Sequence, residues 1–281
     1  MELDPAQRPR RAPTGTHDSA RSDLVHLLRF SPRMSGMSLI GPVRSMLGGL
    51  VAIGFPSPCL ICRASLERPL KGPICDLCWR SMPVIMPPYC PRCGMPFEET
   101  VAPGLCGPCR RERGRRFRRA RAVGPYDGGL KETLLSLKFG GRSRLASTLG
   151  KRAFRSILAT GELDVGAAVV PVPLHWRRRR ERGYNQAELL AKAIAKVAER
   201  PCCSALVKVA PRPPQSGLSA GARRRNAAGA YRARLPAWLR RKRLLLVDDV
   251  FTTGATAEAC TRALLGAGAR SVDVLTVARV P

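Results

Sequence analysis

The sequence has few aromatic residues, few acidic residues and no long uninterrupted apolar run. Aromatic side chains make up 5% of the 281 residues, which argues against extensive base stacking as a mode of binding nucleic acid. The longest apolar stretch, residues 39–55, is interrupted by Pro42, Arg44 and four glycines, so we expect no membrane span. Residues 1–33 are mostly polar and carry six Arg, which is unlike an export signal. We therefore expect a cytoplasmic protein with reduced cysteines.

Positive charge is in large excess. Lys and Arg total 49 against 20 acidic residues, which gives a formal net charge of +29. Such a balance is typical of proteins that contact nucleic acid, phosphorylated metabolites or acidic lipid. Because 41 of the 49 cations are Arg, the composition of a GC-rich genome is an equally good explanation. Local clustering of the arginines is the evidence that would distinguish an anionic partner from genome composition.

Eight of the eleven cysteines form four Cys-x-x-Cys pairs. Twelve residues separate the first pair from the second and the third from the fourth, so one module occurs twice. Two such pairs supply the four thiolates of a structural zinc site. The sequence therefore predicts two zinc ions, held by Cys59, Cys62, Cys75, Cys78, Cys90, Cys93, Cys106 and Cys109.

The spacing leaves the grouping of these cysteines open. A sequential grouping of the first four and the last four is the simplest, and an interleaved grouping is the alternative. Four thiolates leave no position for water, so a zinc here would stabilise the fold rather than catalyse a reaction. Redox-active dithiols or disulfides are the competing interpretation of the pairs. Cys202, Cys203 and Cys260 lie outside the repeat, and we expect them to be buried apolar residues.

Composition divides the chain into three parts. We expect residues 1–55 to be a disordered or poorly ordered tail, with a short amphipathic helix around residues 45–53. Residues 56–112 form the double zinc ribbon, and residues 117–281 form a second domain with a separate core. An arginine run, residues 110–121, joins the last two parts and contains eight Arg and one acidic residue.

The C-terminal part alternates apolar strands with amphipathic helices. This alternation predicts an α/β fold, with a parallel sheet covered by helices on both faces. Ligands of such sheets bind at the carboxyl ends of the strands. We expect strands at residues 121–126, 167–171, 205–209, 243–247 and 272–278, and helices at 129–137, 144–158, 186–198 and 255–265.

The most specific string is LLLVDDVFTTGAT, residues 244–256. It combines an apolar strand, two carboxylates and a short loop that opens into a helix. Loop amides and a helix N-terminus bind phosphate, and hydroxyl groups add donors. The predicted phosphate site is Thr252, Thr253, Gly254, Ala255 and Thr256. Asp248 and Asp249, just past the strand, can accept hydrogen bonds from sugar hydroxyls or face a bound Mg²⁺.

This string resembles the signature of type I phosphoribosyltransferases. The resemblance implies that Asp248 and Asp249 are catalytic residues that bind the ribose hydroxyls of phosphoribosyl pyrophosphate, and that the following loop binds its 5'-phosphate. It also implies a type I phosphoribosyltransferase-like sheet. Phosphoribosyl transfer needs Mg²⁺ and cations to hold the departing pyrophosphate.

Further motifs extend the resemblance to a particular family. KFGG (138–141), PVPLHW (171–176), RERGYNQAELL (180–190), QSGLS (215–219), RRRN (223–226) and VDDVFTTGAT (247–256) follow a cysteine-rich module. The combination is similar to the ComF family of competence-associated, phosphoribosyltransferase-like proteins and covers residues 56–281. Contacts to pyrophosphate or another polyanion are expected from Lys138, Arg177, Arg182 and Arg223. The family implies a link to DNA uptake.

Three functions are compatible with these residues: a phosphoribosyltransferase, a sensor that binds phosphoribosyl pyrophosphate or a ribose 5-phosphate-like ligand without turnover, and a non-catalytic binder of single-stranded DNA. The third would use the arginine run at 110–121 as a track for the phosphate backbone. The acid pair favours the first two, because Asp248 and Asp249 would repel a polyanion. No residue identifies an acceptor substrate, and no oligomeric state is inferred.

Overall fold

A computed structural model describes residues 58–66, 72–97, 104–112, 114–209 and 229–280. The helix expected around residues 45–53, the QSGLS segment and Arg223 lie outside the described residues. The helices are α3 (Asp76–Ser81), α4 (Gly107–Arg111), α5 (Gly128–Phe139), α6 (Leu145–Thr160), α7 (Trp176–Arg182), α8 (Gln186–Val197) and α10 (Ala255–Gly266), with a 3-10 turn η2 (Ala237–Leu239). The strands are β1 (Ala120–Pro125), β2 (Ala168–Pro171), β3 (Leu206–Lys208), β4 (Tyr231–Ala233), β5 (Arg243–Phe251) and β6 (Ser271–Arg279).

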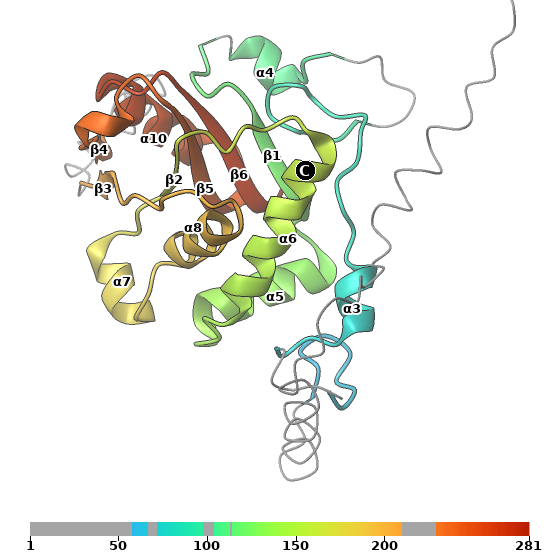
Figure 1. Cartoon of the computed structure of the whole chain (residues 1–281). Coiled ribbons are helices and arrows are strands. Elements are labelled where there is room, and N and C mark those ends of the chain that lie inside the picture. The colour runs from blue at the N-terminus through green and yellow to red at the C-terminus, as the bar shows by residue number, and fades with distance from the viewer. Residues whose placement is uncertain (1–57, 67–71, 98–103, 113, 210–228, 281) are drawn as a thin grey trace, which may run out of the picture. The chain divides into compact units, whose positions relative to one another are not determined.

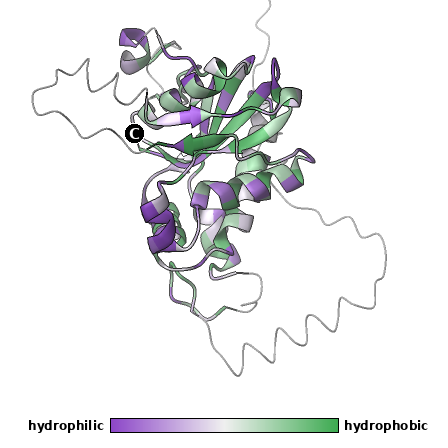
Figure 2. Cartoon of the chain, turned by 90° about the vertical axis from the view of Figure 1, so that its left-hand side faces the viewer, coloured by the Kyte–Doolittle hydropathy of each residue, from purple (hydrophilic) through white to green (hydrophobic). Residues whose placement is uncertain are grey.

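Four strands form one sheet in the order β1-β6-β5-β2, and every neighbouring pair is parallel. In the central strand β5, Leu246 lies opposite Val274 of β6 and Val170 of β2. The strands are mainly apolar in Figure 2 because both faces of the sheet are covered. The predicted α/β fold with a parallel sheet is confirmed.

Successive residues of β5 enter two different cores, because side chains alternate along a strand. Leu245 belongs to the core beneath α5, α6 and α8, whereas Leu244 and Leu246 belong to the core beneath α10. Figure 1 shows α6 and α8 together, and these two helices pack against each other. The antiparallel pair β3–β4 packs against α10. Helices on both faces therefore bury the sheet.

The cysteine modules share these cores, which corrects the expectation of a separate core. Cys59, Leu66 and Met82 of the first module pack in the cluster that contains α5, α6 and α8. All four cysteines of the second module pack in the cluster that contains α10. The sequence could not show this, because the apolar residues of the cysteine segment do not reveal which distant elements they pack against. The two modules are thus built into opposite faces of one sheet.

The segment that connects the two modules runs along the free edge of β1. The amide of Ile85 donates to the carbonyl of Val123 (2.8 Å), and the amide of Ala120 donates to the carbonyl of Arg92 (2.8 Å). A Cβ atom on Gly94 would lie 2.8 Å from the carbonyl oxygen of Ala120, so this approach requires glycine. The connector and the start of the second module thus satisfy two backbone groups of β1 that β6 does not reach.

Beyond short elements that were not expected, such as β4, two elements near the candidate site differ from the sequence expectations. The arginine-rich segment expected to be a loop forms α7, which begins after His175 and ends at Gly183 with φ 78°. Arginine favours helices, and a glycine at the end of such a run marks a helix end, so a signal for this helix was present. Strand β5 continues to Phe251 rather than ending at Val247, which places the acid pair inside the strand. Within the described residues, none of the helices is long and apolar enough to cross a membrane.

Candidate functional site

The eight paired cysteines form two sequential tetrads. In each tetrad, all four Sγ atoms lie within 4.8 Å of one another. The first tetrad is Cys59, Cys62, Cys75 and Cys78, and the second is Cys90, Cys93, Cys106 and Cys109. The Sγ atoms of Cys62 and Cys75 are 3.8 Å apart, and those of Cys93 and Cys106 are 3.5 Å apart. Zn–S bonds of about 2.3 Å at tetrahedral angles place neighbouring sulfurs about 3.8 Å apart. The sulfurs are too far apart for disulfides and fit two structural zinc ions.

The backbone around each tetrad favours thiolates. The amide of Cys75 donates to Sγ of Cys59, and the amide of Cys106 donates to Sγ of Cys90, both at 3.4 Å. Burial alone would raise the pKa of Cys59 and Cys90, but backbone amides lower these pKa values to about 6 and about 7. Burial raises the pKa of Cys78 to about 12, so this thiol depends on a metal to lose its proton.

The predicted phosphate loop joins β5 to α10. Gly254 is the N-cap of α10 and has φ 82°, a conformation that favours glycine. Because Gly254 has no side chain, it cannot cap the first amides of α10, and those after Ala255 remain available to an anion. The hydroxyl of Thr253 accepts from the amide of Ala255 at 3.3 Å. Thr252, Thr253, Ala255 and Thr256 are all exposed, so the loop is open to solvent.

The two carboxylates before this loop have different surroundings. Asp249 pairs with Lys138 at the end of α5, with Nζ–Oδ2 at 3.0 Å. Asp248 accepts from the amide of Asp249 at 2.9 Å. Burial and the neighbouring charge of Asp249 raise the pKa of Asp248 to about 8, although Lys138 and Lys208 oppose the shift. Alternation along β5 directs the two side chains to opposite faces of the sheet. A cation at this edge would relieve their repulsion.

The RERGYNQ segment holds the end of α5 that carries Lys138. The hydroxyl of Tyr184 donates to the carbonyl of Leu137 at 2.6 Å, and Gln186 donates to the carbonyl of Lys138 at 3.5 Å. Asn185 caps α8 by accepting from the amide of Ala187 at 3.1 Å. In the sequence these residues stand out only as part of a motif. Their role in the structure is to place Lys138 beside Asp249.

Arg177 and Arg182, two of the expected polyanion contacts, lie on α7 beside exposed aromatic rings. The guanidinium carbons of Arg177 and Arg180 lie 5.3 and 5.2 Å from the ring centre of Trp176. Arg182 lies 4.7 Å from the ring centre of Phe139, the residue after Lys138. The structure therefore connects α7 to the acid pair through the end of α5. Arg223 lies outside the described residues.

Four of the eight arginines in the run at 110–121, Arg115, Arg118, Arg119 and Arg121, have side-chain partners within the protein. Arg118 pairs with the buried carboxylate of Asp273, with Nε–Oδ1 at 2.9 Å. Arg119 donates to the carbonyl of Glu162 at 2.8 Å, and Arg121 pairs with the carboxylate of Glu162. These contacts do not support the hypothesis of a nucleic-acid track along the run. A run of like charges cannot reveal from sequence which members have internal partners.

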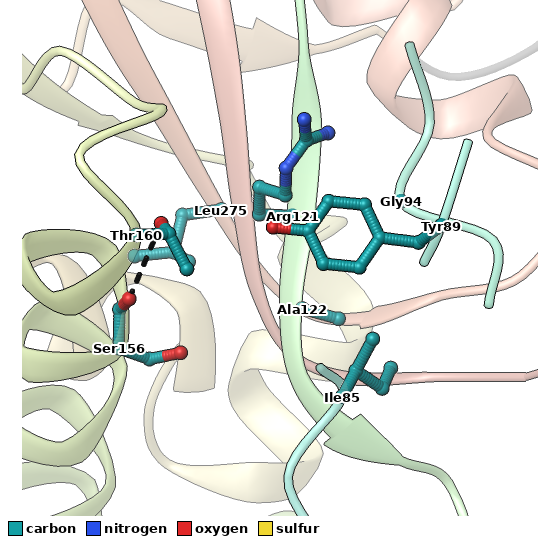
Figure 3. Close-up of a pocket in the computed structure, with 8 residues that line it drawn as sticks. All are labelled: Ile85, Tyr89, Gly94, Arg121, Ala122, Ser156, Thr160 and Leu275. Atoms are coloured by element: carbon teal, nitrogen blue, oxygen red, sulfur yellow. Dashed lines mark hydrogen bonds between the residues drawn. The ribbon is translucent and has the colours of Figure 1, made fainter. Parts of the chain in front are cut away.

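A small pocket lies elsewhere, between the second cysteine module and β1. Figure 3 shows the ring of Tyr89 beside the side chain of Arg121, and Ile85 and Thr160 also line the pocket. Burial and Glu162 raise the pKa of Tyr89, whereas Arg121 lowers it. None of the residues that line this pocket belongs to the phosphate loop or the acid pair. We assign it no part in the candidate site.

The three unpaired cysteines are not part of either tetrad. Cys260 is buried in α10, and burial raises its pKa well above the usual value. Cys202 and Cys203 are half-buried, and burial raises the pKa of both. These thiols stay protonated at neutral pH, in keeping with an apolar packing role for Cys260.

Comparisons with known proteins agree with this architecture. A family model described as a double zinc ribbon domain matches residues 50–110. The chain is 32% identical over 228 residues to the DNA utilization protein YhgH of Escherichia coli K12, covering 80% of this chain and 97% of that protein. It is 30% identical to competence protein F of Haemophilus influenzae (79% and 96% covered) and 29% identical to competence protein ComFC of Bacillus subtilis (79% and 83% covered).

A solved structure also matches part of the chain. It is the glutamine phosphoribosylpyrophosphate amidotransferase of B. subtilis complexed with ADP and GMP. The match has a TM-score of 0.34 and 20% identity, and it covers 47% of this chain and 25% of that chain. With the double zinc ribbon, the parallel sheet and relatives that match over nearly their whole length, the chain belongs to the ComF family of YhgH, competence protein F and ComFC.

Proposed function

We propose that the protein binds phosphoribosyl pyrophosphate, or a related ligand such as ribose 5-phosphate, at the carboxyl end of β5. The observation that carries this proposal is the acid pair followed directly by an exposed loop whose N-cap is Gly254. The amides of Thr253–Thr256 would bind the 5'-phosphate, and Asp248 and Asp249 would accept the ribose hydroxyls. Lys138 and Arg182 would then lie on the side where the pyrophosphate charge must be neutralised.

The donor chemistry of the acid pair fits Mg²⁺. Carboxylate oxygens suit this ion, and a divalent charge would offset the burial and the charge of Asp249 that raise the pKa of Asp248. When bound, Mg²⁺ would supply charge that stabilises pyrophosphate as it departs. The contribution of this chain is to orient the ribose with its carboxylates and to hold the phosphate with the loop amides.

Binding of phosphoribosyl pyrophosphate should be measured by isothermal titration calorimetry with and without Mg²⁺. We expect the double variant Asp248→Asn, Asp249→Asn to lose at least tenfold in affinity. Glu132→Gln is the control for the loss of a carboxylate elsewhere, because Glu132 is an exposed acid on α5 and its replacement removes one of the two charges that the double variant removes. Equal affinity of the double variant and the parent would refute the proposal. A pyrophosphate-release assay with a panel of bases and oligonucleotides then separates transferase from sensor.

We also propose that α7 contacts single-stranded DNA. Trp176 is 53% exposed and Phe139 is 69% exposed, and arginines lie against both rings. Exposed rings offer stacking surfaces to bases, and adjacent guanidinium groups bind phosphates. The names of the relatives, DNA utilization protein and competence proteins, support a role in DNA uptake. We place this role in the cytoplasm, where the paired cysteines stay reduced.

Fluorescence anisotropy with a labelled oligo-dT tests the α7 surface. Trp176→Ala should weaken binding by about tenfold, since stacking contributes about 1–3 kcal/mol per base. Trp238→Ala is the control, because Trp238 is also 53% exposed but lies on η2. Replacing Arg177 and Arg180 by Gln should flatten the log-log salt slope by about 0.7 for each phosphate that the variant no longer neutralises. Equal effects of the two tryptophan variants would exclude the surface.

A further inference from the structure

Arg115 reaches the phosphate loop from a segment that is distant in the sequence. Its Nη2 donates to the carbonyl of Thr253 at 3.0 Å, and its Nε donates to Glu112 at 2.9 Å. The side chain is only 6% exposed, although it belongs to a strongly charged run. A buried guanidinium is retained in proteins where its donors are used. Here one of those donors fixes a carbonyl of the proposed phosphate-binding loop.

Arg115 and Phe251 together leave no space behind the loop. A Cβ atom on Gly254 would lie 2.6 Å from Nη1 of Arg115 and 2.6 Å from the ring of Phe251. The ring of Phe117 packs edge-on against Phe251, with centroids 6.1 Å apart, and Arg115 lies over the ring of Phe117 at 5.6 Å. The loop is therefore supported from behind by residues of two segments that are far apart in sequence.

The segment that carries Arg115 and Phe117 begins at the second cysteine tetrad. Cys109 lies in α4, which ends at Arg111, and the next residue is Glu112, the partner of Arg115. The amide of Arg116 donates to the carboxylate of Glu258 at 2.8 Å, and Glu258 lies in the first turn of α10. Both the phosphate loop and the helix N-terminus that follows it are thus tied to the segment that leaves the tetrad. The first tetrad packs on the other face of the sheet.

We propose that Arg115 is a positioning residue for the phosphate loop, through which the second zinc ribbon holds the loop amides in a conformation that binds a phosphate monoester. This inference rests on the proposed function. By binding the carbonyl of Thr253, Arg115 keeps that oxygen behind the loop and leaves the amides in front. Its charge also lies beneath the anion site and favours a phosphate there.

The test compares two arginines of the same run in the full chain. Arg115→Ala removes the support, and Arg116→Ala removes an exposed side chain with the same charge while keeping the backbone amide that binds Glu258. Calorimetry with ribose 5-phosphate should show about a tenfold loss for Arg115→Ala and less than a twofold loss for Arg116→Ala. Mg²⁺-pyrophosphate is the second probe, because it lacks the 5'-phosphate. Its affinity should be unchanged in both variants.

Two further variants show where the support comes from. Arg115→Lys keeps the charge and one donor, so it should recover part of the lost affinity and serves if Arg115→Ala does not fold. Glu112→Gln leaves all the zinc ligands in place and should weaken ribose 5-phosphate binding by about twofold to threefold. The zinc content of every variant should equal that of the parent.

Amide hydrogen exchange across residues 252–258 gives a readout that needs no ligand. Exchange should accelerate in Arg115→Ala and stay unchanged in Arg116→Ala. Unchanged exchange and unchanged ribose 5-phosphate affinity in Arg115→Ala would overturn the inference, as would an equal loss for both probes. If the parent binds neither probe, the proposed function fails, while the exchange data still decide whether Arg115 positions the loop.

Discussion

The two cysteine tetrads share their spacing and their amide-to-sulfur hydrogen bonds, yet they differ in burial. All four cysteines of the second tetrad are buried, whereas Cys62 of the first is exposed and Cys75 is half-buried. The first packs beneath α5, α6 and α8, and the second packs beside α10. The repeated cysteine spacing therefore determines the geometry of each metal site. The elements that pack around each tetrad determine how strongly the stability of the fold depends on that metal.

The largest expected contrast comes from replacing one ligand in each tetrad. Cys93→Ser should remove the second zinc and lower the free energy of unfolding by about 3 kcal/mol or more, since Cys93 is 3% exposed and lies within a core. Cys62→Ser should remove the first zinc at about a third of that cost, because water can reach this position. Zinc analysis and thermal unfolding check both. Equal losses of stability would show that burial does not separate the two tetrads.

A smaller contrast comes from the arginines that attach each module to the sheet. Arg279 is buried and donates to the carbonyl of Cys93 at 2.7 Å, whereas the half-buried Arg152 donates to the carbonyl of Met82 at 2.9 Å. We expect Arg279→Met to cost about 2 kcal/mol and Arg152→Met about 1 kcal/mol. Each variant should accelerate chelator-induced zinc release from its own module alone. Accelerated release of both zincs in either variant would contradict the separation of the two faces.

The smallest effect concerns Asp248 at the carboxyl end of β5, where a negative charge destabilises the fold. Burial and Asp249 raise the pKa of Asp248 to about 8, so the folded protein holds a proton that the unfolded chain releases near pH 4. Stability should therefore be highest below pH 4 with respect to this group and should fall as the pH rises to about 8. Asp248→Asn should stabilise the ligand-free protein at pH 8.5 by about 1 kcal/mol.

Urea unfolding in Mg²⁺-free buffer without chelator measures this effect, with Glu132→Gln as the control. Identical pH profiles for the parent and Asp248→Asn would show that the carboxyl is not perturbed. A stabilising substitution at this position would fit a residue that is kept for binding at the expense of stability.

The sequence predicted the parts of the molecule that depend on local spacing. The four Cys-x-x-Cys pairs and the strand-loop-helix around Gly254 are encoded within short segments, and the structure has both. The predicted strand end at Val247 was wrong, because β5 continues to Phe251. Acidic residues are rare in strands, so the two adjacent carboxylates indicated that the strand had ended. The phosphate-binding and catalytic roles of these residues stay predictions.

Contacts between distant segments could not be predicted. Arg115 and Arg116 are neighbours of the same type, but one is buried against Thr253 and the other is exposed. No property of either residue distinguishes them before the chain folds. The same limit applies to the two candidate residues Lys138 and Asp249, whose contact depends on how the end of α5 is placed against the sheet.

The connector along β1 has a consequence for the behaviour of the protein without metal. A bare edge strand exposes a row of amides and carbonyls that can pair with another chain. In this protein two backbone groups in that row are bonded, one by Ile85, which lies between the two tetrads, and one by Arg92, which lies between the ligands Cys90 and Cys93. We therefore expect loss of zinc to free the connector and to expose the edge of β1 to strand addition by a second copy of the chain.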